Sequence, residues 1–262
     1  MVVLLHGLTG SHRSGYNQRL AQLLVPMGYR VVRMDMRGAG RGIRWAKKCY
    51  NAGSSADVRA VLAELNQWSP KSSVAVVGFS LGGNMALKLA GECQLHPVRN
   101  LAAVAAINSP INLRDCSELL SQPHNHRYTR FFASALAAHV HKHRYYAGLP
   151  RIHFPKDLTL WQFDEIYTAP EAGYRDVPDY YQNASSFPVL EAIKIPTLMF
   201  TARDDPFICV KPYEHVPPRP GLHVHVEPLG GHLGYLGFNG ANFRWVEPQI
   251  ARWLRKTLPI YG

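Results

Sequence analysis

The chain has 262 residues and a formal net charge of +11, and 47% of its residues are hydrophobic. This length and apolar content predict one domain with a sizeable core and room for an inserted segment. The excess of Lys and Arg favours an anionic partner, such as a phospholipid surface or an acidic substrate. We predict no nucleic-acid binding, because the sequence has no helix-turn-helix, zinc or RNA-recognition signature.

The cysteines show neither metal-binding nor redox spacing; they are Cys49, Cys93, Cys116 and Cys209. Such usage favours reduced thiols and therefore predicts a cytoplasmic location. No run of residues has the length of a transmembrane helix. The apolar stretch at residues 1–5 is too short for a signal peptide and lacks its basic flank.

Short apolar runs alternate with segments of helical spacing in the first and last parts of the chain. We expect helices at 16–27, 56–68, 84–90 and about 243–258, and strands at 2–5, 29–34, 74–77, 101–107, 195–202 and 222–227. This alternation predicts an α/β fold with a mostly parallel central sheet and helices on both faces.

The alternation stops near residue 110 and resumes near residue 195. No strand–helix unit can be recognised between these points. We therefore predict a core formed by residues 1–109 and 196–262, with residues 110–195 inserted as a cap over the strand ends.

Residues 78–82 read Gly-Phe-Ser-Leu-Gly and lie between an expected strand and an expected helix. In this position the G-x-S-x-G pattern predicts a strained turn that exposes the hydroxyl of Ser80 at the top of the sheet. The helix that follows directs its N-terminal N–H groups toward an oxygen that gains negative charge. Ser80 is therefore the candidate nucleophile.

Partners for a nucleophilic serine follow in the chain order that α/β-hydrolases use, first an acid and then a histidine. Asp204 and Asp205 come after the strand at 195–202, and either can orient an imidazole or occupy a solvated turn. His232 lies in a glycine-rich loop after the strand at 222–227, where a general base is expected. A loop histidine without a catalytic role is the alternative.

The loop His6-Gly7-Leu8 follows the first expected strand. The backbone N–H of Leu8 can face the N–H of Leu81, so that the pair forms an oxyanion hole. A His-Gly pair after a strand is also consistent with an ordinary turn.

These motifs make the sequence similar to the YheT-like branch of the α/β-hydrolases, which is related to the ABHD lipases and esterases. The segments that carry the resemblance span nearly the whole chain: residues 6–11, 34–40, 78–84, 179–181 with 185–186, 202–207 and 230–234. The resemblance implies that Ser80 is the nucleophile, His232 the base and Asp205 the acid, since Asp205 comes three residues after the small Ala202. It also implies hydrolysis of carboxylic esters, in some members acyl transfer to alcohols, and no cofactor.

The sequence departs from this family at its start, where a segment and two strands usually precede the His-Gly loop. Here Met1 already lies in the strand that leads to the loop. We therefore expect residues 29–34 to form an exposed edge strand, and the isolated 262 residues to be marginally stable or poorly soluble with an intact site.

The expected cap is basic and rich in histidine. His139 and His143 would share a helix face and His141 would point away, but no acid lies between His124 and Arg151 to complete a hydrolytic metal centre. We predict a solvated basic face and no metal. We interpret Asp164 and Glu165 as structural. The apolar side chains either line an acyl pocket or form the cap's own core; they include Phe131, Phe132, Leu136, Tyr145, Tyr146, Trp161 and Phe163.

The sequence as a whole predicts a carboxylic ester hydrolase in which Ser80, His232 and Asp205 form a triad and water attacks an acyl-enzyme. We expect a small-molecule or lipid ester as substrate, with peripheral contact to an anionic membrane surface. Two alternatives stay open. One is an acyltransferase, in which an alcohol replaces water, and the other is a catalytically inactive binding protein on the same fold.

Overall fold

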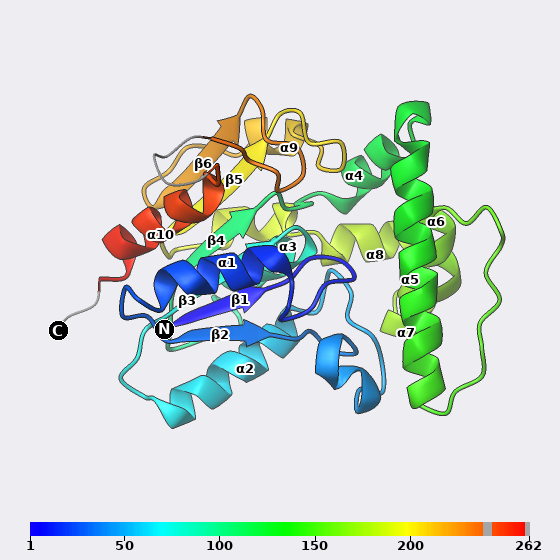
Figure 1. Ribbon diagram of the computed structural model, residues 1–262, viewed down its shortest axis with the longest axis horizontal. Coiled ribbons are helices and arrows are strands. Elements are labelled where there is room, and N and C mark those ends of the chain that lie inside the picture. The colour runs from blue at the N-terminus through cyan, green and yellow to red at the C-terminus, as the bar shows by residue number, and fades with distance from the viewer. Residues whose placement is uncertain (238–242, 260–262) are drawn as a thin grey trace.

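The computed structural model describes residues 1–237 and 243–259, and a parallel sheet runs through its centre (Figure 1). The described residues form six strands in the order β2-β1-β3-β4-β5-β6. Their bounds are β1 Val2–Leu5, β2 Val31–Met34, β3 Val74–Phe79, β4 Leu101–Ile107, β5 Thr197–Ala202 and β6 Leu222–Glu227. Every neighbouring pair is parallel, which confirms the α/β class and the expected six-strand parallel core.

Helices cover both faces of the sheet because the side chains of each strand alternate between them. Val3 and Leu5 pack on one side against α2 (Ser55–Trp68) and α3 (Leu81–Glu92). Val2 and Leu4 pack on the other side against helices α1 and α10, which span Gly15–Leu24 and Val246–Thr257. Burial on both faces explains why the central strands read as continuous apolar runs.

Several expected boundaries are wrong by a few residues; for example, helix α1 ends at Leu24 rather than at residue 27, and strand β5 begins at Thr197 rather than at residue 195. Strand β2 begins at Val31, because the N–H of Tyr29 still closes the end of α1 on the carbonyl of Leu24. Helix α10 begins at Val246, with Pro248 in its first turn, where the missing N–H of proline costs no helical hydrogen bond. Strand β2 lies at the edge of the sheet, as expected.

The connection from β4 to β5, which we call the cap segment (residues 110–195), is helical throughout its regular structure. Its elements are α4 Leu113–Leu120, η2 Pro123–Asn125, α5 His126–Tyr146, α6 Leu160–Phe163, η3 Asp164–Thr168, α7 Ala169–Ala172, α8 Val177–Ala184 and η4 Phe187–Ala192. The long helix α5 stands beyond the carboxyl ends of the strands (Figure 1). The described residues also form two short elements outside this segment, η1 Gly40–Arg44 and α9 Lys211–Glu214.

A buried asparagine ties the cap segment to the rest of the molecule. The Nδ2 group of Asn84, on α3, donates to the carbonyls of Ala52 and Ala184 at 3.1 and 2.8 Å. Its Oδ1 accepts from the N–H of Ser186 at 2.8 Å. Because all of these groups are buried, each bond spares a polar atom from desolvation without a partner. Two of the segments that carry the family resemblance therefore meet at this junction.

Candidate active site

The turn between β3 and α3 holds Ser80 in a strained conformation, with φ 53° and ψ −124°. The glycines around it allow a close approach of backbone segments. A Cβ atom on Gly78 would lie 2.2 Å from the carbonyl oxygen of Gly82, and one on Gly82 would lie 2.5 Å from the carbonyl oxygen of His6. Only glycine fits at these two positions, and the turn presents the hydroxyl of Ser80 beyond the strand end.

The three candidate triad residues lie in one hydrogen-bonded row. The Nε2 atom of His232 is 3.2 Å from the Oγ of Ser80, and its Nδ1 is 2.8 Å from Oδ2 of Asp205. Since an ionised carboxylate only accepts hydrogen bonds, the proton belongs on Nδ1, and Nε2 is free to accept from the serine hydroxyl. This arrangement suits proton transfer from Ser80 to His232.

The carboxylate of Asp205 is buried and fully provided with hydrogen-bond donors. Its Oδ1 accepts from the N–H groups of Phe207 and Ile208 at 2.8 and 3.2 Å. Its Oδ2 accepts from Nδ2 of Asn108 at 2.7 Å as well as from His232. These donors fix the orientation of the carboxylate.

Asp204 has a different position. Its Oδ1 accepts from the N–H of Gly231 at 2.8 Å, and its side chain is exposed. It therefore anchors the glycine loop that carries His232, while Asp205 contacts the imidazole.

The loop after β1 leaves one backbone N–H available beside Ser80. The N–H of Gly7 donates to the hydroxyl of Tyr16, and that of Thr9 donates to the hydroxyl of Tyr50, each at 2.8 Å. Among the hydrogen bonds of the described residues, neither the N–H of Leu8 nor that of Leu81 has an acceptor. Both residues line the same pocket as Ser80.

A buried imidazole holds this loop in place. The N–H of Met36 donates to Nε2 of His6 at 3.1 Å, so the ring proton lies on Nδ1, which donates to the carbonyl of Gly7 at 2.8 Å. Burial lowers the pKa of His6, so that the ring stays neutral as these two bonds require. The segments at residues 6–11 and 34–40 are therefore joined through this ring.

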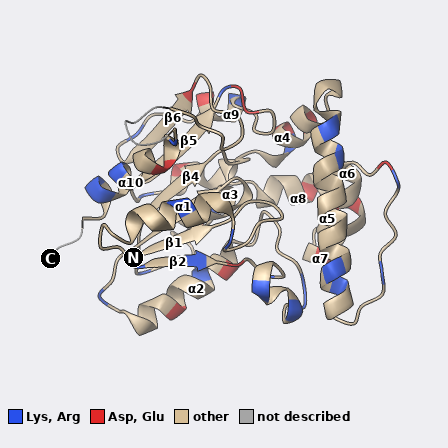
Figure 2. Ribbon diagram, in the orientation of Figure 1, with Lys and Arg blue, Asp and Glu red and all other residues tan. Residues whose placement is uncertain are grey.

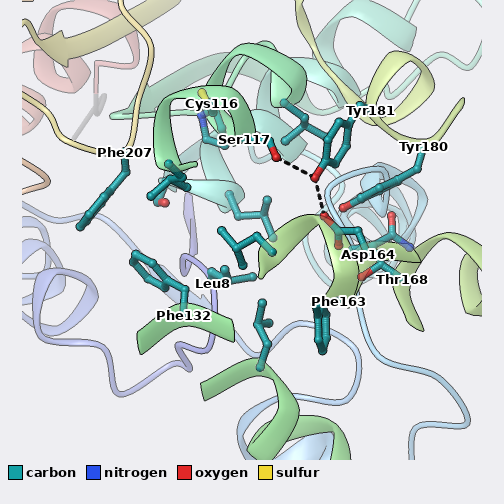
Figure 3. A pocket seen from close by; sticks show the side chains of 18 of the residues that line it. Leu8, Cys116, Ser117, Phe132, Phe163, Asp164, Thr168, Tyr180, Tyr181 and Phe207 are labelled. Carbon is teal, nitrogen blue, oxygen red and sulfur yellow. Dashed lines mark hydrogen bonds between the residues drawn. The ribbon is translucent and has the colours of Figure 1, made fainter. Parts of the chain in front are cut away.

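The site opens into a pocket of about 1030 Å³, a volume that includes its opening to solvent. Ser80 and His232 lie in its wall, and the cap segment supplies most of the remaining wall (Figure 3). The lining is mainly apolar, as in many small-molecule sites.

The aromatic and apolar side chains of the cap segment divide into two groups. Phe132, Leu136 and Phe163 line the pocket. Phe131 and Tyr145, by contrast, are 65% and 81% exposed. Tyr146 and Trp161 are also on the surface. The sequence could not separate these groups, because the outcome depends on the rotation of α5 and on how the later helices fold against it.

Two histidines of α5 serve as hydrogen-bonding groups in the fold. His143 is buried, and its Nε2 contacts the carbonyl of Ala46 at 2.8 Å. His141 points elsewhere and contacts the carbonyl of Ile152 at 2.9 Å. In residues 1–237 and 243–259, no group of three or more His, Cys, Asp or Glu side chains is placed to hold a metal ion.

The fold and the serine-bearing turn place the protein among the α/β-hydrolases. A family model described as "alpha/beta hydrolase fold" matches residues 1–237, and the chain belongs to this family. The chain is 32% identical over 267 residues to YheT of Escherichia coli (strain K12), covering 98% of this chain and 77% of that protein. The resemblance to YheT-like α/β-hydrolases is thereby confirmed.

Other relatives are longer than this chain. Phospholipase ABHD3 of Bos taurus is 29% identical over 240 residues, covering 90% of this chain and 58% of that protein. Medium-chain fatty acid ethyl ester synthase/esterase 2 of Saccharomyces cerevisiae (strain ATCC 204508 / S288c) is 29% identical over 283 residues, covering 98% of this chain and 62% of that protein. The chain thus spans about three fifths of both relatives.

A solved structure supports the fold. The esterase Pf2001 of Pyrococcus furiosus superimposes with a TM-score of 0.61 at 18% identity, covering 98% of this chain and 82% of that chain.

Sequence reasoning missed two polar side chains beside the candidate triad. Asn108 follows β4, and its carboxamide contacts Asp205. Tyr235 donates from its hydroxyl to Oδ1 of Asn108 at 2.7 Å. The available signal was the position of Asn108 directly after a buried parallel strand, at the same sheet edge as Ser80 and Asp205.

Proposed function

We propose that the protein is a serine hydrolase that cleaves carboxylic esters through an acyl-enzyme, with Ser80 as nucleophile, His232 as general base and acid, and Asp205 as the acid that orients His232. The observation that carries this proposal is the row of contacts from Ser80 to His232 to Asp205, at 3.2 and 2.8 Å. Relatives whose names include phospholipase and esterase support ester chemistry.

The proposed reaction has two halves. Oγ of Ser80 attacks the ester carbonyl carbon while its proton moves to Nε2 of His232. The carbonyl oxygen becomes an oxyanion and accepts hydrogen bonds from the N–H groups of Leu8 and Leu81. His232 then protonates the departing alkoxide, and the C–O bond to the alcohol breaks. In the second half, water gives a proton to His232 as its oxygen attacks the acyl carbon. The bond between that carbon and Oγ of Ser80 then breaks, and His232 returns the proton to Oγ, which releases the acid and restores Ser80.

The closest alternative differs only in the second half. An alcohol that enters in place of water would receive the acyl group and give a new ester. The yeast relative is named as both a synthase and an esterase, which favours keeping this alternative. Hydrolysis is the simpler proposal, since water is always present at the opening of the pocket.

Labelling with a fluorophosphonate probe separates a live nucleophile from an inactive binding protein on the same fold. We expect the label on Ser80, and no label on Ser80→Ala. A series of p-nitrophenyl esters of increasing acyl length, with and without added alcohol, then separates hydrolysis from transfer. An unlabelled wild-type protein without esterase activity would contradict the proposal.

We also propose that the protein contacts anionic lipid surfaces through one corner of the molecule. Helix α5 contains four Lys or Arg residues and no acid, and residues 40–48 contain four more and no acid (Figure 2). The two segments are in contact, since the guanidinium of Arg44 lies 4.8 Å from the ring centre of Tyr146. Within the described residues, no helix has the length and hydrophobicity needed to cross a bilayer.

Large apolar side chains stand among these charges. Trp45 is 79% exposed and Tyr145 is 81% exposed. Amphipathic rings beside cationic side chains suit the headgroup region of a bilayer. We call this surface the basic–aromatic patch; it comprises Arg41, Arg44, Trp45, Lys47, Lys142 and Tyr145.

A further inference from the structure

A carboxyl group lies in the wall of the apolar pocket, apart from the candidate triad. Asp164, the first residue of η3, lines the same pocket as Ser80 and His232. Figure 3 shows Asp164 on one side of the pocket and the pair Phe132 and Phe207 on the other. The ring of Phe207 lies 4.7 Å from that of His232, so this second side adjoins the candidate triad.

The neighbours of Asp164 leave it with unused capacity for hydrogen bonds. The hydroxyl of Tyr181 lies 2.8 Å from Oδ2 of Asp164 and 3.1 Å from Oγ of Ser117 (Figure 3). A carboxylate offers about four lone-pair sites, and the hydroxyls of Tyr181 and Thr168 account for two of them. Because Asp164 lines the pocket, a ligand bound there can supply donors to the remaining sites.

No cation balances this acid in the described part of the chain. None of the ion pairs among the described residues involves Asp164, and the pocket wall contains neither Lys nor Arg. His139, which also lines the pocket, has its pKa lowered by burial and is therefore neutral. A carboxyl group in an apolar wall without a cation is costly, and such groups in pockets are frequent at functional sites.

The backbone at Asp164 gives a second, independent indication. Residues 164–168 form a π-helical turn between α6 and α7. A π-turn inserts an extra residue into a helix, is less stable than the α-helix, and occurs frequently at functional sites. Here it begins at the residue whose carboxyl group enters the pocket.

We propose that Asp164 is a specificity-determining residue, which accepts a hydrogen bond from a hydroxyl or ammonium group on the part of the ester that occupies the pocket. This inference rests on the proposed esterase function. The preferred substrate is then an ester with an apolar chain that spans the pocket and ends in a hydrogen-bond donor. An ester whose chain ends without such a donor would leave the Asp164 carboxyl desolvated and unpaired. The enzyme should therefore prefer the ester that carries the donor.

The test compares matched pairs of esters that differ only at the end of the chain. One series uses p-nitrophenyl alkanoates with their ω-hydroxy and ω-amino forms, over several chain lengths. A second series places the same groups on the alcohol side of simple acetate esters, followed by acid release. For each pair, the kcat/KM of the ester with the hydroxyl or amino group is divided by the kcat/KM of the plain ester. In one of the two series, this ratio should be at least about tenfold higher for the wild-type enzyme than for Asp164→Leu. Glu165→Gln is the matched control, because this neighbouring acid is exposed and lies outside the pocket wall.

A second variant and a binding measurement test the role of Asp164 independently of the first comparison. Asp164→Asn keeps the size of the side chain and serves if Asp164→Leu does not fold; it should lower the preference for the ammonium form more than that for the hydroxyl form. Calorimetric titration with 1-octanol, 1,8-octanediol and octylamine measures the same preference without catalysis. Equal ratios for wild type and Asp164→Leu in both ester series and in calorimetry would overturn the role of Asp164. If the wild-type protein hydrolysed none of these esters but still preferred the hydroxyl or amino compounds in calorimetry, only the proposed esterase function would be overturned.

Discussion

Asn108 donates a hydrogen bond to the same carboxylate oxygen of Asp205 that His232 contacts, at 2.7 Å against 2.8 Å for the histidine. The Nδ2 group of Asn108 also lies 3.1 Å from the carbonyl of Gly231, next to His232 in the chain. Asn108 itself adopts a positive φ of 46°, a conformation that asparagine tolerates better than most residues. It therefore joins the acid to the histidine loop as a positioning residue.

Removing the carboxamide of Asn108 should lower kcat while changing KM little. We expect a loss of about tenfold or more for Asn108→Gly, because a hydrogen bond to a charged group is worth about 1.5–3 kcal/mol. Glycine is the suitable replacement because it accepts the positive φ without strain. Tyr235→Phe removes only the hydrogen bond to Oδ1 of Asn108 and should have a smaller effect. Steady-state kinetics on a p-nitrophenyl ester provide the comparison, with the exposed Asn183→Ala as control; an unchanged kcat in Asn108→Gly would exclude the positioning role.

Ser80→Ala should abolish ester hydrolysis and leave the fold intact, because alanine has the same Cβ and only the nucleophile is lost. His232→Ala should be about as damaging, since the two residues act as one unit, and the loss should reach several orders of magnitude in kcat. Both variants are assayed with the same ester, and circular dichroism confirms folding. Substantial activity in a folded Ser80→Ala protein would show that the nucleophile lies elsewhere.

The two adjacent aspartates should differ sharply. Asp205→Asn replaces an acceptor of the Nδ1 proton of His232 with a group that can present a donor there, so the imidazole loses its tautomer and orientation. Asp204→Asn keeps a carbonyl oxygen that can still accept from the N–H of Gly231, and its effect should be small. The kcat values of the two variants on one ester decide the ranking. If Asp204→Asn were the more damaging change, the acid would be Asp204 and the other roles would stand.

The pH dependence of stability should report on Asp164. Burial raises the pKa of its carboxyl to about 6 from the ordinary value of 3.8, against the opposing effect of hydrogen bonds from Thr168 and Tyr181. The folded protein therefore binds this proton more tightly than the unfolded chain, and stability falls as the pH rises through the window between these values. The penalty is absent below pH 3.8 and complete above about pH 6.

Asp164→Asn lacks this ionisation and should gain stability relative to wild type as the pH rises from about 4 to about 6. Thermal unfolding of both proteins across pH 4–8 measures the difference in melting temperature. Glu165→Gln serves as a control and should show no such trend, because the side chain of Glu165 is exposed. A difference that stays constant over the whole range would mean that Asp164 does not titrate in this window.

The sequence was sufficient to predict the sheet and the candidate triad, because each of these features leaves a local pattern. Buried parallel strands appear as short apolar runs, and Ser80 and His232 both lie in glycine-bearing turns directly after such runs. Asp205 could be preferred over Asp204 only through the family resemblance, because both follow the same strand. Asn108 has no motif of its own, and its role depends on β4 and β5 lying side by side, which only the folded sheet shows.

The sequence alone interprets Asp164 as a structural acid, and it cannot place this residue in a pocket, for a related reason. Its sequence neighbours indicate nothing about a pocket, since the π-turn that begins at Asp164 and the distant Tyr181 together define its position. Helix α5 posed the same difficulty. Phe131 and Phe132 are adjacent in sequence, but one faces solvent and the other the pocket. Such differences arise from tertiary packing and cannot be derived from composition or spacing.

The basic–aromatic patch should bind vesicles of acidic lipid more tightly than vesicles of neutral lipid, and the preference should weaken with salt. Each exposed cation near an anionic surface contributes about 1 kcal/mol, and salt screens this attraction over roughly 8 Å at physiological ionic strength. Changing Arg44, Lys47 and Lys142 together to Glu should reduce binding more than tenfold at low salt. Trp45→Ala should weaken binding at high salt as well, because the ring contributes apolar burial that salt does not screen.

Trp68→Ala is the matched control, since Trp68 is 73% exposed but lies at the end of α2, outside the patch. Sedimentation with vesicles measures all of these proteins, and equal binding of the wild type to neutral and acidic vesicles would show that the patch has no such role.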